Sequence, residues 1–97
     1  MRKISTDKAP AAIGPYSQAV VAGDFLYASG QIPVNPATGN VEAEGITAQA
    51  QQAMANVGEI LKAAGATYDN VVKTTCFLAD IADFGAFNEV YAKYFTQ

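Results

Sequence analysis

The sequence contains no histidine and a single cysteine, Cys76, among its 97 residues. One cysteine cannot form a disulfide within the chain. Because histidine is the commonest metal ligand and general base, its absence excludes a Ser-His-Asp triad, a Cys-His pair and a zinc site of the usual kind. We therefore expect no metal. Cys76 lies in an apolar segment without an adjacent base, so we expect an inert thiol in the core.

Positive charge is also scarce, with six Lys and Arg against nine Asp and Glu and a net charge of −3. The cations are scattered along the chain, at Arg2, Lys3, Lys8, Lys62, Lys73 and Lys93. Proteins that bind nucleic acids cluster their cations to displace counterions from the phosphates. The sequence therefore predicts no nucleic-acid partner.

Long apolar runs are missing as well. The uninterrupted apolar stretches are a few residues long, whereas a helix that spans a bilayer needs about 20. The first residues, MRKISTD, contain no hydrophobic signal-peptide region. We expect no membrane partner and a cytoplasmic protein.

What the sequence does contain is enough apolar residues, 51% of its 97, for one domain over residues 1–97. A chain of this length keeps little net stability once conformational entropy is counted. Self-association would add buried surface, so we expect an oligomer.

The first half of the chain predicts a β-hairpin. Residues 16–21 can alternate as a strand, residues 25–33 read as the partner strand, and Gly23-Asp24 supplies the turn. The turn-forming residues 35–40 predict a surface loop before the short segment Val41-Glu42.

A helix is predicted from Thr47 to Ala64, with Thr47 capping its start and Gly65 its end. Its apolar positions recur at helical spacing and are Ala50, Ala53, Met54, Val57, Ile60, Leu61 and Ala64. Gly58 inside this helix costs about 1 kcal/mol relative to alanine.

The β-branched residues of 70–78 predict a further strand, and Asp80 is placed to cap a second helix. The aromatic residues of that helix are Phe84, Phe87, Tyr91, Tyr94 and Phe95. This order of elements predicts an α+β fold in which both helices pack on one face of a mixed β-sheet. The other face would then have to meet another subunit or remain exposed as an apolar patch.

Three blocks of the sequence carry a family resemblance: APAAIGPYSQ at residues 9–18, SGQIPVNPATG at 29–39, and VVKTT at 71–75, which leads to Asp83, Phe84 and Asn88. In their order and spacing they resemble the Rid/YjgF family of reactive intermediate imine/enamine deaminases. The resemblance runs nearly from end to end of the chain, which makes it far more specific than a lone short motif.

The resemblance implies a chorismate-mutase-like fold and a homotrimer whose sheets form a central barrel. The helices would lie outside, and three equivalent ligand sites would lie in the clefts between subunits. It also implies hydrolysis of the enamines and imines made by pyridoxal-phosphate dehydratases, such as 2-aminoacrylate and 2-iminobutanoate, to 2-keto acids and ammonia. The family uses no metal or organic cofactor.

Carried over by position, Tyr16 would line the cleft, Ser29 and Gly30 would contact the substrate, and Asn88 would stand at the cleft edge. The family's carboxylate-binding Arg and water-positioning Glu would both follow position 97. Its last two strands, one of which lies inside the sheet, would follow it too. The resemblance thus implies a C-terminally truncated chain, in which the catalytic residues are not identified.

Each of these residues also has a structural interpretation. The Tyr16 ring alone would be expected to pack on the sheet, and a glycine such as Gly30 commonly marks a β-bulge. Asn88 at the edge of an apolar helix stripe is as well explained by a hydrogen bond to a neighbouring strand or subunit. Lys73 is better explained as a solvated strand residue than as a ligand contact.

Three functions are compatible with the sequence. The first is a trimeric 2-iminobutanoate/2-iminopropanoate deaminase. The second is a non-catalytic trimeric binder of small carboxylate metabolites, which would use the same cleft without the Glu. The third is the RNA-cleaving role of some relatives, which the acidic charge and the missing histidine disfavour.

Overall fold

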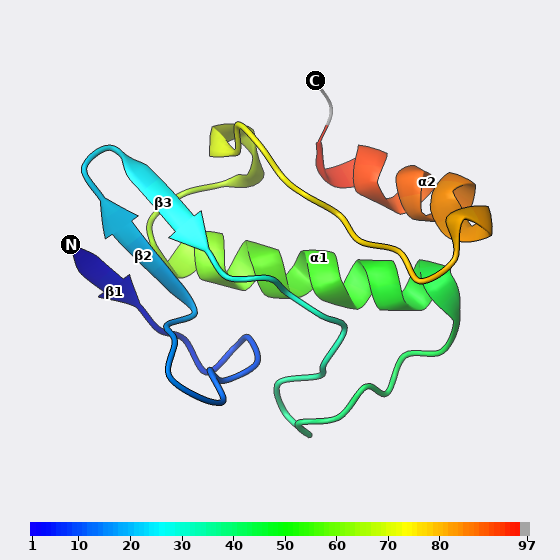
Figure 1. The fold of residues 1–97 in the computed structure, drawn as a ribbon, viewed down its shortest axis with the longest axis horizontal. Helices are drawn as coiled ribbons and strands as arrows, with labels where there is room; N and C mark the ends of the chain where they lie inside the picture. Colours follow the sequence, from blue (N-terminus) through cyan, green and yellow to red (C-terminus); the bar gives the residue numbers. More distant parts are fainter. Residues whose placement is uncertain (96–97) are drawn as a thin grey trace.

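The computed structural model describes residues 1–95. A three-stranded antiparallel sheet of β1 (Arg2–Ile4), β2 (Ala19–Ala22) and β3 (Phe25–Ala28) lies in that order, with β2 in the centre. Figure 1 shows the sheet at one end of the molecule. The predicted hairpin is confirmed, and Gly23 makes its turn at a positive φ of 59°. Its strands are shorter than predicted, and β1 was not predicted.

The strand register separates the two faces of the sheet. Ala19 pairs with Ala28 and Val21 with Leu26, and on this face Ala19, Val21 and Leu26 pack in a core cluster with Ile60 of the long helix. The remaining members of that cluster are Ile4, Ala9 and Ala64. The opposite face carries Val20, Phe25 and Tyr27, and the two aromatic side chains are more than half exposed.

The predicted long helix is confirmed as α1 (Gly45–Ala63), which starts two residues earlier than predicted. Thr47 does not cap it: Glu44 holds the capping position and makes no side-chain hydrogen bond there. The end is as predicted, because Gly65 adopts φ +80° and the amides of Gly65 and Ala66 donate to the carbonyls of Lys62 and Leu61. This pair of bonds is a Schellman motif, which satisfies carbonyls that the last turn leaves open.

A short 3-10 helix, η1 (Tyr68–Asn70), follows and places the Tyr68 side chain against α1. The Tyr68 hydroxyl donates to the Met54 carbonyl at 2.7 Å. A Cβ at position 58 would collide with this hydroxyl. Gly58 is therefore required by the approach of Tyr68, and its cost in helix propensity is offset by that packing.

The second helix is confirmed and begins with a tight turn, η2 (Ile81–Asp83), that continues into α2 (Phe84–Tyr94). Asp80 caps the turn, since its carboxylate accepts from the Ala82 amide at 2.9 Å. The second core cluster joins α2 to α1 through Ala50, Met54 and Val90, which is 2% exposed.

Four predicted aromatic residues pack around this cluster, namely Phe87, Tyr91, Tyr94 and Phe95. Phe84 does not join them and is 56% exposed. It is the first residue of α2, and its side chain lies outside the contact with α1.

The predicted strand over residues 70–78 is wrong. Asn70 belongs to η1, and residues 71–79 form no regular structure. A strand requires a neighbour that accepts its backbone hydrogen bonds, and none of the described residues pairs with this segment. Its side chains are consequently open to solvent: Val72 is 84% and Phe77 is 92% exposed.

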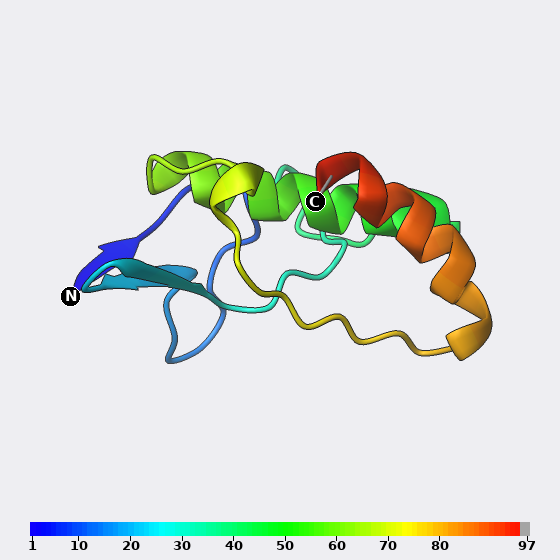
Figure 2. The same cartoon turned by 90° about the horizontal axis from the view of Figure 1, so that it is seen from above.

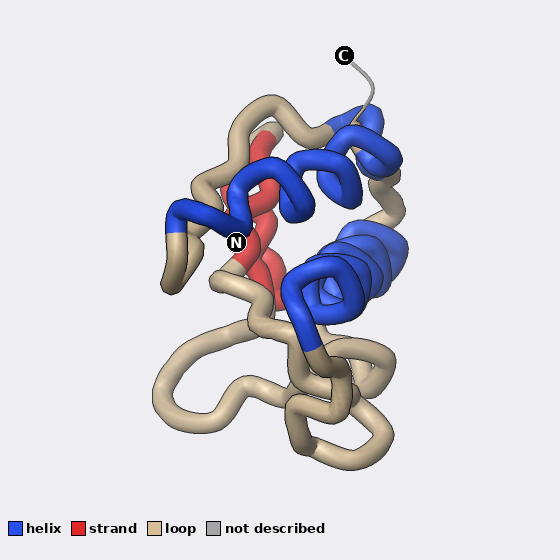
Figure 3. Tube along the Cα trace, turned by 90° about the vertical axis from the view of Figure 1, so that its right-hand side faces the viewer, coloured by secondary structure: helices blue, strands red, loops and turns tan. Residues whose placement is uncertain are grey.

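The elements form two layers (Figure 2). One layer contains α1 and α2 side by side, and the other contains the sheet and the segment 71–79. Helix α1 covers the sheet, whereas α2 packs against α1 and lies over the segment. Two long loops, residues 5–18 and 29–44, lie together at one edge below α1 (Figures 1 and 3). Neither helix of the described chain has the length and apolar character needed to cross a membrane.

Candidate functional site

Ser29 and Gly30 lie where β3 ends and the second long loop begins. The Ser29 amide donates to the Gln18 carbonyl at 3.0 Å, and the Ser29 hydroxyl donates to the Ser17 carbonyl at 2.7 Å. These two bonds tie the start of the 29–44 loop to the end of the 5–18 loop. The hydroxyl oxygen keeps its lone pairs, so Ser29 can still accept a hydrogen bond from a ligand.

Tyr16 lies next to this junction. Its amide donates to the Gly14 carbonyl at 2.9 Å, and Gly14 adopts a φ of +112° that favours glycine. The tyrosine side chain is 53% exposed and does not belong to either core cluster. The Tyr16 ring therefore faces solvent and is not packed in the core of the sheet.

A shallow hollow of about 270 Å³ lies on the outer face of the hairpin. Its lining residues are Ser17, Ala19, Val20, Tyr27, Ala28 and Ser29. This lining includes two serines and one tyrosine, but neither a cation nor a carboxylate. As it stands, the hollow offers hydrogen bonds and apolar contact to a small ligand, without a charge to hold a carboxylate.

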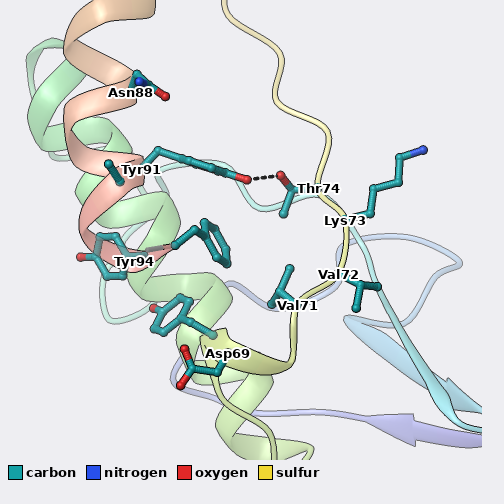
Figure 4. A pocket seen from close by; sticks show the side chains of 11 residues that line it. Asp69, Val71, Val72, Lys73, Thr74, Asn88, Tyr91 and Tyr94 are labelled. Carbon is teal, nitrogen blue, oxygen red and sulfur yellow. Dashed lines mark hydrogen bonds between the residues drawn. The ribbon is translucent and has the colours of Figure 1, made fainter. Parts of the chain in front are cut away.

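Asn88 lies elsewhere, in a larger cavity of about 580 Å³ between α2 and the segment 71–74 (Figure 4). The Tyr91 side chain reaches from α2 across this cavity, and its hydroxyl forms a hydrogen bond with the Thr74 hydroxyl. Lys73 also belongs to the lining, but its side chain extends away from α2. Asn88 is exposed, so its amide can be satisfied by water and needs no protein partner.

The four residues expected at the site are thus divided. Ser29 and Gly30 are adjacent to the loop that carries Tyr16, and Ser29 lines the hollow on the sheet. Asn88 does not line that hollow and faces the second cavity. Residues 1–95 of one chain therefore do not bring all four residues into one site.

Cys76 was expected in the core, and this expectation is wrong. The thiol is exposed, and the Thr74 hydroxyl lies 3.9 Å from its sulfur. The reason is the same as for the missing strand, because no strand among residues 1–95 pairs with the segment that carries Cys76.

Two buried amides near the site were missed. Gln18 is 5% exposed and joins the ends of its loop, because its Nε2 donates to the carbonyls of Thr6 and Pro10 while its Oε1 accepts from the Thr6 amide. Asn56, on α1, is 1% exposed. The position of Gln18 inside a matched block was a signal, whereas Asn56 had none beyond a polar residue on an apolar helix.

Burial raises the pKa of Tyr68, and the nearby Tyr94 and Glu59 raise it further. Within residues 1–95, no three His, Cys, Asp or Glu side chains come together in a way that would hold a metal ion.

Comparison with known proteins decides the family. A sequence model of the family described as Endoribonuclease L-PSP matches residues 6–97. The chain belongs to this Rid/YjgF family. A curated goat (Capra hircus) protein named 2-iminobutanoate/2-iminopropanoate deaminase is 57% identical over 94 residues, which are 97% of this chain and 69% of that protein.

Solved structures of Rid/YjgF proteins share the fold. The YjgF gene product of Escherichia coli is 49% identical, with a TM-score of 0.92 over 99% of this chain and 75% of that one. E. coli TdcF, solved with bound serine, is 43% identical, with a TM-score of 0.93 over the same shares of the two chains. The predicted α+β Rid/YjgF-like fold is therefore confirmed, although the strands of residues 1–95 pair antiparallel and do not form the mixed sheet that was predicted.

Proposed function

We propose that this Rid/YjgF chain functions in the hydrolytic deamination of reactive enamines and imines, with 2-iminobutanoate and 2-iminopropanoate as substrates. The observation that carries the proposal is the 57% identity to a protein named for that activity. Water adds through its oxygen to the imine carbon, a proton moves to the nitrogen, and ammonia leaves as the 2-keto acid forms. The reaction needs no oxidant or reductant.

The described residues contribute binding and positioning to this reaction. Ser29 and the Gly30 backbone, held against the end of the 5–18 loop, offer hydrogen bonds to a small polar substrate. The exposed ring of Tyr16 next to them provides an apolar wall with a hydroxyl at its tip. Asn88 supplies an amide from α2, at the edge of the same cleft once neighbouring subunits are in place.

A homotrimer is part of the proposal. The sheet face that carries Phe25 and Tyr27 is apolar and uncovered, with these side chains 56% and 60% exposed. Covering this face with other subunits would also enclose the hollow that Ser29 lines. We further propose a cytoplasmic location, because a single exposed thiol suits a reducing compartment.

The second candidate is a trimeric binder of small carboxylates that does not turn them over. It is favoured by the lining of the hollow, which holds no carboxylate to position a water molecule. The two functions differ in one measurement. A dehydratase that generates 2-aminoacrylate in the assay supplies the substrate, and the rate of keto-acid and ammonia release is compared with and without the chain.

Release above the uncatalysed rate supports the deaminase, and Ser29→Ala should lower it. Saturable binding of 2-oxobutanoate without any increase in release would contradict the deaminase and support the binder. Val41→Ala, which changes an exposed apolar residue in a loop outside the hollow, is the matched control and should leave the rate unchanged.

A further inference from the structure

Asn56 is the most completely buried polar side chain of α1, with 1% of its surface exposed. Its Nδ2 donates to the carbonyl of Ile32 at 3.0 Å and to the carbonyl of Val34 at 2.9 Å. Its Oδ1 accepts from Nε2 of Gln52 at 3.0 Å. Both amide hydrogens and the amide oxygen are therefore used, and two of the three bonds reach a loop that is more than 20 residues away in sequence.

That loop begins with Ser29 and Gly30. At its start, Ser29 is fastened to the 5–18 loop through its amide and its hydroxyl. Residues 30–34 form no strand or helix, and the Asn56 amide holds the far end of this stretch against α1. Gly30 thus lies between two anchors, of which one is the junction of Ser29 with the 5–18 loop and the other is Asn56.

We propose that Asn56 is a positioning residue that sets the geometry of Ser29 and Gly30 toward the substrate. The inference rests on the proposed function, in which these two residues contact the substrate. Asn56 does not line the hollow and acts only through the loop backbone. The role requires an amide, because two carbonyls need two N–H donors at one point. Aspartate at this position would offer acceptors only, and leucine would leave the carbonyls of Ile32 and Val34 without this donor.

The consequence for activity follows from the tolerance of a site to displacement. A misplacement of about 1 Å can lower a rate about a hundredfold, even when the altered residue lies away from the chemistry. Among the hydrogen bonds of residues 1–95, the two from Asn56 are the only ones that join a side chain of α1 to residues 30–34. Loss of Asn56 removes both. We therefore expect Asn56→Ala to lower kcat/KM by about 10- to 100-fold.

The experiment must separate positioning from general loss of stability. The control is Ile60→Val, about one helical turn from Asn56 in the core cluster that packs α1 on the sheet, with Ile60→Ala as a more severe version. All variants of the full chain are assayed below their unfolding transitions, and kcat/KM is compared with the fall in Tm. Positioning predicts that Asn56→Ala loses about tenfold or more, while a control with the same fall in Tm stays within about threefold.

A double-mutant cycle with Ser29→Ala supplies a second readout that loss of stability alone would not move. If Asn56 acts through Ser29 and Gly30, the effects on kcat/KM should be less than additive. Should Asn56→Ala fail to fold, Gln52→Ala removes the donor to Oδ1 alone, and a loss of about threefold in kcat/KM with a smaller fall in Tm is expected.

Amide hydrogen exchange distinguishes failure of this inference from failure of the proposed function. Asn56→Ala should speed exchange at residues 29–34 more than the Tm-matched Ile60 variant does, whether or not the chain turns over an imine. If the wild-type chain does not turn over an imine but Asn56→Ala still speeds exchange at residues 29–34, the proposed function is overturned and the anchoring role of Asn56 stands. Unchanged exchange at 29–34, or equal losses of kcat/KM in Asn56→Ala and its control, would overturn the positioning role.

Discussion

The hydroxyl of Tyr68 occupies the space that a side chain at Gly58 would need. Helix propensity alone predicts that Gly58→Ala stabilises α1 by about 1 kcal/mol. The structure predicts the reverse, a loss of about 1–3 kcal/mol in the free energy of unfolding, because the ring of Tyr68 must move or lose its bond to the Met54 carbonyl.

Chemical denaturation of Gly58→Ala tests this, with Gly85→Ala as the matched control. Gly85 lies inside α2 with open space where its Cβ would be, so alanine there should be neutral or stabilising by up to about 1 kcal/mol. Equal stabilisation by both substitutions would show that Tyr68 does not approach α1 as described.

The raised pKa of Tyr68 makes stability depend on alkaline pH. Burial, followed by the influence of Tyr94 and Glu59, favours the neutral phenol in the folded state. Its pKa there lies above the unfolded value of about 10, so this contribution is complete below pH ~10 and is lost as pH rises through the folded-state pKa. Denaturation midpoints measured from pH 8 upward should fall in the wild type and fall less steeply in Tyr68→Phe.

Exposure of Cys76 predicts that Cys76→Ser changes the free energy of unfolding by less than about 0.5 kcal/mol. A thiol reagent should label Cys76 rapidly without denaturant. If the substitution is instead destabilising and the thiol is protected, the segment 71–79 is covered in solution by another element or another chain.

The family resemblance and the uncovered sheet face together predict a trimer that depends on Tyr27. Light scattering coupled to size exclusion should report three chains for the wild type and fewer for Tyr27→Glu, because burying a carboxylate in an apolar contact is costly. Val41→Glu, which places the same charge at an exposed loop residue, should not change the mass. A wild-type monomer would remove the subunit clefts on which the proposed site depends.

The curated goat relative is longer than this chain, which aligns with 69% of it. The resemblance places a carboxylate-binding Arg and a water-positioning Glu in the family's C-terminal segment. We expect a chain extended by that segment to be at least about a hundredfold more active, since each group contributes roughly tenfold or more. Ammonia release at equal trimer concentration is the measurement, and equal rates would show that Tyr16, Ser29, Gly30 and Asn88 suffice.

The sequence predicted the long helix and the hairpin because short-range signals specify both. The apolar period of α1 and the αL glycine Gly65 define a helix and its end without reference to the rest of the chain. The same holds for the hairpin turn at Gly23. Strand β1 was missed because Arg2–Ile4 is too short to show a period, and it forms only through its pairing with β2.

The misassigned strand and the missed amides have one cause in common. The β-branched composition of residues 71–78 expresses a preference, but a strand also needs a partner that the described chain does not supply. Asn56 and Gln18 look like surface residues in the sequence, and only contacts with distant carbonyls make them buried anchors. The site residues themselves were inferred by resemblance, and their roles stay predictions.

The outer edge of β3 has a further consequence for the behaviour of the chain at high concentration. Within residues 1–95, β3 pairs only with β2, so the backbone of Phe25–Ala28 presents a row of open donors and acceptors on its other side. The strand reads FLYA and contains no lysine or proline to repel an incoming chain. Such an edge is a template for pairing with a strand of another chain. Because this pairing adds chains without closing into a ring, it leads to aggregates.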